Sequence, residues 1–167
     1  ALGYGLSLTQ DRTVLVVDIG GGTMHVVLVR LTTRGAMGGE GMVLAKRGRP
    51  LGGNAVDGWV LQDLCKEMGY PLVEPEVDEG TRLWRRLMLA EACRVKEAVF
   101  FDESATFLLT PPGLTCAPGS QPPGSGFVTL TRARLVELLE ENGFFRGLIN
   151  SLEEVLEQAK LTPEAVE

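Results

Sequence analysis

The stretch VVDIGGGTMHVVLV, residues 16–29, places three consecutive glycines between two apolar runs that are rich in β-branched residues. Such runs are typical of strands, so residues 13–17 and 23–31 are expected to pair as a hairpin through the glycines. Glycine loses much conformational entropy on folding, and a run of three therefore needs a physical reason. The residues leave two interpretations open: a tight hairpin turn, or a backbone that a bound phosphate approaches closely.

The chain after this hairpin continues with one more strand pattern and then changes period. Residues 40–48 predict a third strand, which would complete a small antiparallel sheet. From residue 54 onward the apolar residues recur three and four positions apart, which indicates a helix. Asn54 is its expected N-cap, Asp57 lies in its expected first turn, and Gly69 is its expected stop.

A second helix and a second pair of strands follow. Residues 81–100 carry an apolar helical stripe, and residues 104–110 and 126–131 have the character of strands. The segment between these strands, residues 111–126, is rich in proline and glycine, and we interpret it as a mobile loop.

The last part of the chain is predicted to be helical. Thr131 is expected to begin one helix that Gly143 interrupts, and a second helix follows it. Thr162 and Pro163 stand where an N-cap and a first helical residue belong. The expected inner side of the second helix consists of Phe145, Leu148, Ile149, Leu152, Leu156 and Ala159.

Composition excludes several classes of protein. The 167 residues fit one domain, with 44% hydrophobic and 23% charged residues. A net charge of -6 argues against a nucleic-acid or anionic-membrane surface, and no apolar run is long enough to span a bilayer. Cys65, Cys93 and Cys116 are widely spaced and accompanied by one histidine, which favours free thiols over a metal site. We expect a cytoplasmic protein.

Several segments together resemble a known family. LVVDIGGGTMHVVLV, PLGGNAVDGWVLQDL, EACRVKEAVF and the helix pair that begins at LTRARLVELLEENGF are similar to the ATPase domain of the seventy-kilodalton heat-shock chaperones. The resemblance covers the chain from end to end. It implies an α/β fold of the actin-like ATPase (ribonuclease H-like) class, with this chain as the second lobe of a nucleotide-binding domain.

The resemblance also implies a division of that lobe. Residues 1–50 correspond to part of an inner subdomain with the phosphate-binding hairpin. Residues 51–130 correspond to an outer subdomain of helices and a small sheet, and residues 131–167 to helices that return to the inner subdomain. We expect the chain to be a piece of a longer protein.

The site residues that the resemblance implies lie around the glycine run. The backbone N–H groups of Gly20, Gly21 and Gly22 would face the phosphates of ATP or ADP. Thr23 would hydrogen-bond the terminal phosphate or the attacking water, and Asp18 would order water bound to Mg²⁺. Lys96 would contribute to the adenosine site.

Two departures from the family pattern bear on this site. His25 stands where the family usually has an aspartate near the bound ions. Cys93, Lys96, Glu97 and Phe100 share one helical face, and in the family the matching face holds adenine and ribose with glutamate, lysine, arginine and serine. Only Lys96 matches, so the resemblance implies weakened adenosine binding.

Three functions are compatible with these residues. The first is a lobe of a divergent heat-shock chaperone of the stress response, whose parent couples ATP hydrolysis to the folding of client proteins and is served by a nucleotide-exchange factor or co-chaperone. Hydrolysis would need the first lobe, so the isolated chain is expected to be inactive. The second is a non-catalytic scaffold or co-chaperone with a degraded nucleotide site. The third is another actin-like phosphotransferase or phosphatase.

Overall fold

The computed structural model describes residues 10–33, 40–70, 78–112 and 124–166. The chain forms two compact units, which are described separately below. The first consists of residues 1–52 and 143–167, and the second of residues 53–142. Within the described ranges, no helix combines the length and the apolar character that spanning a membrane requires.

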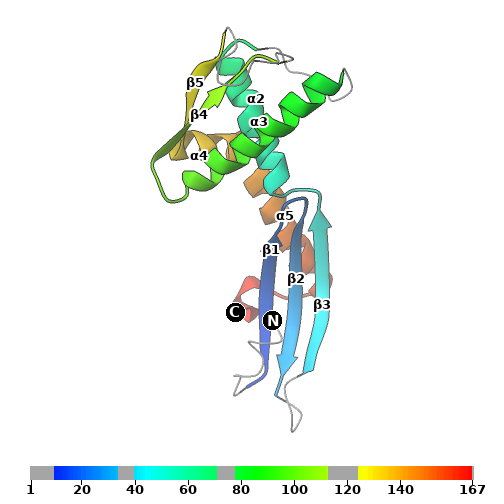
Figure 1. The fold of residues 1–167 in the computed structure, drawn as a ribbon. Helices are drawn as coiled ribbons and strands as arrows, with labels where there is room; N and C mark the ends of the chain where they lie inside the picture. The colour runs from blue at the N-terminus through cyan, green and yellow to red at the C-terminus, as the bar shows by residue number, and fades with distance from the viewer. Residues whose placement is uncertain (1–9, 34–39, 71–77, 113–123, 167) are drawn as a thin grey trace. The chain divides into compact units, whose positions relative to one another are not determined.

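The first unit is built on the predicted hairpin. Strands β1 (Arg12–Ile19), β2 (Met24–Thr32) and β3 (Glu40–Arg49) form an antiparallel sheet in the order β1-β2-β3 (Figure 1). Ile19 lies opposite Met24, so the two strands meet through the glycine run as the sequence indicated. The three predicted strands of this sheet are confirmed.

Helix α5 (Phe144–Ala159) packs along this sheet and closes its core (Figure 1). Val26 and Leu28 of β2, Ala45 of β3 and Val155 of α5 are buried together. The helix contributes Leu148, Leu152 and Ala159 to the same core, as predicted. These side chains lie on one stripe of the helix because they are three or four residues apart.

The predicted inner side of α5 is too wide. Phe145 and Ile149 are 39% and 52% exposed, whereas Phe144 and Ser151 are buried. The contact with the sheet follows the stripe that contains Val155, and the two exposed side chains lie beside this stripe. After the helix, the expected start at Thr162 and Pro163 is present as the short 3-10 helix η1 (Pro163–Ala165).

The second unit combines three helices with a two-stranded sheet. Helices α2 (Gly53–Glu67) and α3 (Glu79–Ala98) pack on each other, and β4 (Ser104–Leu109) pairs antiparallel with β5 (Gly126–Thr131). Helix α4 (Arg132–Glu141) follows β5 directly. These elements confirm the predicted helices and strands. Most of the predicted loop at residues 111–126, including Cys116, lies outside the described residues.

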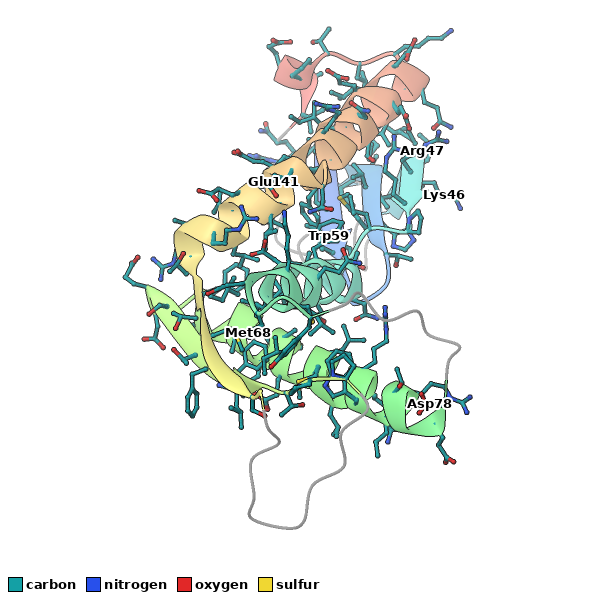
Figure 2. All side chains as sticks on the ribbon, turned by 90° about the horizontal axis from the view of Figure 1, so that it is seen from above. Lys46, Arg47, Trp59, Met68, Asp78 and Glu141 are labelled. Carbon is teal, nitrogen blue, oxygen red and sulfur yellow. The ribbon has the colours of Figure 1, made fainter. Side chains whose placement is uncertain are left out.

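The helix termini follow from local hydrogen bonds, with one correction. Asp78 caps α3, because its side chain accepts hydrogen bonds from the N–H and the hydroxyl of Thr81, and Figure 2 shows it at the start of that helix. Thr131 caps α4 as predicted, and Gly69 and Gly143 stop helices with φ of 69° and 71°. Asn54 is not an N-cap.

Helix α2 begins one residue before Asn54, at Gly53, and Asp57 falls beyond its first turn. Asn54 therefore lies inside the helix and not at the capping position before it. The backbone of Gly52 is held against the glycine turn of the hairpin, and the helical conformation starts directly after this contact.

Candidate functional site

The glycine turn closes the hairpin with a loop of two residues. The Gly20 N–H donates a hydrogen bond of 2.8 Å to the Thr23 carbonyl oxygen, which leaves Gly21 and Gly22 as the loop. Loops of this length usually adopt positive φ angles, which favour glycine. Among the described residues, positive φ occurs only at Gly69, Gly124, Gly143 and Lys160. The turn geometry therefore does not require the glycines.

Packing within the protein does not require two of these glycines either. A Cβ atom at Gly22 would have no heavy atom within 4 Å, and one at Gly20 would meet only the Thr23 carbonyl oxygen, at 3.6 Å. Both residues are exposed. No described residue accepts a hydrogen bond from the N–H groups of Gly21 or Gly22. The end of the hairpin thus offers two backbone donors and open space, which suits an anion.

The opposite side of the turn is closed by Gly52. A Cβ atom there would lie 2.5 Å from the Gly20 carbonyl oxygen and 2.7 Å from that of Gly21. It would also lie 2.8 Å from the Thr23 backbone nitrogen. Distances this short are incompatible with any side chain, so glycine is required at this position and lets the segment after β3 support the turn.

Polar side chains flank the turn on the exposed side of the sheet. Asp18 and His25 lie directly opposite each other on β1 and β2, and both are exposed, as is Thr23. The ring of His25 lies over Gly48 of β3, since a Cβ atom there would be 3.0 Å from His25 Cδ2. A carboxylate and a hydroxyl thus lie on strand residues close in sequence to the two backbone donors, and these are groups that suit a phosphate with a hydrated cation.

Lys96 belongs to the second unit and has protein partners there. Its Nζ atom lies 2.7 Å from Asp57 Oδ1 and 3.4 Å from the Gly53 carbonyl oxygen. On the same helical face, Cys93 Sγ lies 3.5 Å from Glu97 Oε1, and Phe100 is 66% exposed. Burial and the nearby charge of Asp57 raise the pKa of the Cys93 thiol. No described group of three or more His, Cys, Asp or Glu side chains is arranged to hold a metal ion.

Comparison with known proteins identifies the family. A family model described as Hsp70 protein matches residues 1–167. The chain belongs to the Hsp70 family. It is 30% identical over 174 residues to the chaperone protein DnaK of Thermus thermophilus, an alignment that covers 100% of the chain and 26% of that relative.

Two chaperone HscA homologues are similar as well. The HscA homologue of Shewanella frigidimarina is 34% identical over 119 residues, with 70% of the chain and 17% of the relative covered. That of Shewanella amazonensis is 36% identical over 110 residues, with 65% and 16% covered. The chain spans about a quarter or less of the length of these relatives.

Membership of the Hsp70 family confirms the resemblance seen in the sequence, and the mixed α/β structure agrees with the expected fold class. The assignment to the second lobe, its subdivision and the nucleotide roles of Gly20, Gly21, Gly22, Thr23, Asp18 and Lys96 stay predictions. The first unit brings Asp18 and Thr23 together with the three glycines. Lys96 lies in the other unit, where it neutralises Asp57.

Sequence reasoning missed the residues that support the site. Gly52 is one of two adjacent glycines between a strand and a helix, and this pair was the available signal for a close backbone contact. Asp57 was assigned to a helix terminus, whereas it pairs with Lys96. No local sequence pattern predicts this ion pair, because its two residues lie on different helices.

Proposed function

We propose that this Hsp70-family chain is the second lobe of a chaperone nucleotide-binding domain and that its glycine turn binds the phosphates of Mg-ATP and Mg-ADP. The observation that carries the proposal is the exposed turn itself. None of its glycines has the positive φ that would favour glycine. A Cβ atom at Gly20 or Gly22 would also meet no close neighbour within the protein. Close approach of a ligand to the backbone is the remaining physical reason for glycine.

The residues around the turn have separate roles in this proposal. The N–H groups of Gly21 and Gly22 donate to phosphate oxygens, while that of Gly20 holds the turn closed. Thr23 hydrogen-bonds the terminal phosphate or orients the attacking water. Asp18 accepts hydrogen bonds from water bound to Mg²⁺, and the cation supplies positive charge against the phosphates.

The parent protein would use this lobe as Hsp70 chaperones do. In the proposal, the first compact unit, residues 1–52 and 143–167, contributes to an inner subdomain, and the second, residues 53–142, which includes α4, forms the outer one. A complete protein would add the first lobe and couple ATP hydrolysis to client binding, with an exchange factor or co-chaperone as a further partner. The chain alone supplies half of a cleft, so weak nucleotide binding and no hydrolysis are expected from it.

Calorimetric titration of Mg-ADP and Mg-ATP tests the proposal on the full-length gene product and on this chain. Gly22→Ala should weaken binding about tenfold in the full-length protein, because a methyl group would occupy the space of a phosphate oxygen. Gly58→Ala is the matched control, because its Cβ atom also has no neighbour within 4 Å but lies in α2. Absence of binding in the folded full-length protein, or equal binding by both variants, would contradict the proposal.

A second candidate is a non-catalytic scaffold of the same family. It is favoured by the face of α3, where Lys96 pairs with Asp57 while Glu97 and Phe100 replace the expected arginine and serine. An exposed phenylalanine supplies no hydrogen bond to a ribose, and Lys96 already directs two of its three N–H donors to Asp57 and to the Gly53 carbonyl oxygen. A folded full-length protein that binds exchange factors or clients without binding nucleotide would establish this function.

A further inference from the structure

The glycine turn is linked to helix α5 through the four residues that end β3 and precede α2. Gly52 lies directly against the turn, as described above, and the next contact is made by its neighbour. A Cβ atom at Gly147 of α5 would lie 2.8 Å from Leu51 Cδ2. The leucine side chain is therefore seated against the helix backbone, one residue away from the support of the turn.

Arg49 adds a polar connection to the same helix. Its Nε donates a hydrogen bond of 2.7 Å to Ser151 Oγ, and its guanidinium lies 2.8 Å from Glu154 Oε1. Ser151 is 1% exposed, and its hydroxyl donates in turn to the Gly147 carbonyl oxygen at 2.8 Å. Arg49, Ser151 and the backbone of α5 are thus connected by consecutive hydrogen bonds.

The connecting segment is short and stiff. Only Pro50 and Leu51 separate Arg49 from Gly52, and the proline ring restricts the backbone between them. A displacement of α5 relative to β3 would therefore be passed to Gly52 and to the carbonyl oxygens of Gly20 and Gly21 that face it. The N–H groups of the loop belong to the same peptide units and would change direction with them.

We infer that α5 positions the glycine turn for phosphate binding, with Arg49 and Ser151 as positioning residues that do not themselves touch the ligand. The predicted effect on nucleotide binding rests on the proposed function. The structural claim, that Arg49 and Ser151 fix the direction of the loop N–H groups, holds for the ligand-free protein as well.

Arg47 provides a matched control. It also pairs with Glu154 and lies on the same strand, two residues farther from the turn. Its side chain is 54% exposed, and Ser151 is bound by Arg49. Arg47→Met removes the same type of side chain and a contact to the same carboxylate, but leaves the connection from Ser151 to Gly52 intact.

The first measurement is glycine-labelled ¹⁵N–¹H NMR of the ligand-free chain. Arg49→Met and Ser151→Ala should shift or broaden the amide signals of Gly20, Gly21 and Gly22, and Arg47→Met should leave them in place. Arg49→Lys keeps a positive charge near Glu154 but loses the planar guanidinium that contacts Ser151 and Glu154 at once, so its effect should be intermediate. Unchanged turn signals in folded Arg49→Met and Ser151→Ala would overturn the inference. If Arg49→Met does not fold, Ser151→Ala and Arg49→Lys decide the question.

The second measurement is Mg-ADP titration of the same variants in the full-length protein. Arg49→Met and Ser151→Ala should raise the dissociation constant about threefold to tenfold, the range expected for the loss of one supporting hydrogen bond. Arg47→Met should bind like the unmodified protein. Nucleotide binding that is insensitive to Arg49 and Ser151 would overturn the positioning role. Absence of binding in the unmodified protein would instead refute the proposed function, and the NMR result would then decide the structural link alone.

Discussion

Lys96 Nζ lies 2.7 Å from Asp57 Oδ1, and the two side chains are only 12% and 10% exposed. The pair joins α3 to α2 across the interior of the second unit. Two charges removed from water stabilise a fold only as long as both are present, because either one alone would be buried without a counter-charge. Lys96 is therefore a structural residue of this unit, whatever part it takes in nucleotide binding.

Removal of either Lys96 or Asp57 should therefore destabilise the second unit. Lys96→Met is expected to lower the free energy of unfolding by about 3 kcal/mol, because it leaves the Asp57 carboxylate uncompensated. Asp57→Leu combined with Lys96→Met should recover most of that loss, since an apolar pair has no desolvation penalty. Urea unfolding of both single variants and the double variant measures the coupling. Simple additivity of the two single effects would show that the residues do not interact.

The two sides of the glycine turn should respond differently to a methyl group. Gly52→Ala is expected to lower the free energy of unfolding by about 2 kcal/mol, because its Cβ atom would lie 2.5 Å from the Gly20 carbonyl oxygen. Gly22→Ala should leave stability nearly unchanged, as its Cβ atom meets nothing within 4 Å. Thermal and urea unfolding compare the two. Equal stability of both variants would disprove the close packing of Gly52 under the turn.

Arg134 ties α4 to α2 through one of its three carboxylate partners. Its guanidinium makes two hydrogen bonds to Asp63, of 3.0 and 2.7 Å, and it also contacts Glu137 and Glu141. Asp63→Asn should lower the free energy of unfolding by about 1 kcal/mol, because it weakens a bidentate contact between two helices. Glu137→Gln is the control, with an expected change below about 0.5 kcal/mol for an exposed pair within one helix. Urea unfolding in which Glu137→Gln is the more damaging change would contradict this assignment.

Cys65 should be an unreactive thiol in the folded chain. Burial raises its pKa from the ordinary value of 9.0 to about 11, against the opposing positive charge of Arg85. At pH 8 about one thiol in a thousand would then be ionised, and the thiolate is the reactive form. Alkylation followed by mass spectrometry should label Cys65 slowly in the folded chain and rapidly in urea. Fast labelling of the folded protein would refute the burial of this side chain.

The same shift predicts how stability changes in alkaline solution. The unfolded thiol loses its proton near pH 9 while the folded one retains it, so the unfolded state binds fewer protons between pH 9 and about 11. The contribution of Cys65 to stability is therefore present below pH 9 and declines above it. Cys65→Ala should have a flatter profile of unfolding free energy over this range, and a profile of unchanged slope would count against the assignment.

The elements of the fold were predictable to the extent that their signals are local. Thr131 and Gly143 bound α4 as expected, because a side-chain cap and a left-handed glycine act on the backbone within a few residues. The hairpin around the glycine run was equally clear from the two β-branched strands. Asn54 is not the cap because α2 already begins at Gly53, directly after Gly52, whose contact with the turn joins residues far apart in the sequence.

The sequence by itself determined the strands, the helices, the glycine turn and the resemblance to the Hsp70 family, since periodicity, capping residues and motif spacing are properties of the chain. Only the tertiary structure decided that Gly52 supports the turn, that Arg49 reaches Ser151 on α5, and that Lys96 is neutralised by Asp57. The physical reason is that these contacts join residues which no local interaction brings together. They form because burial of the two cores places the elements side by side, and each buried polar group must then find its partner there.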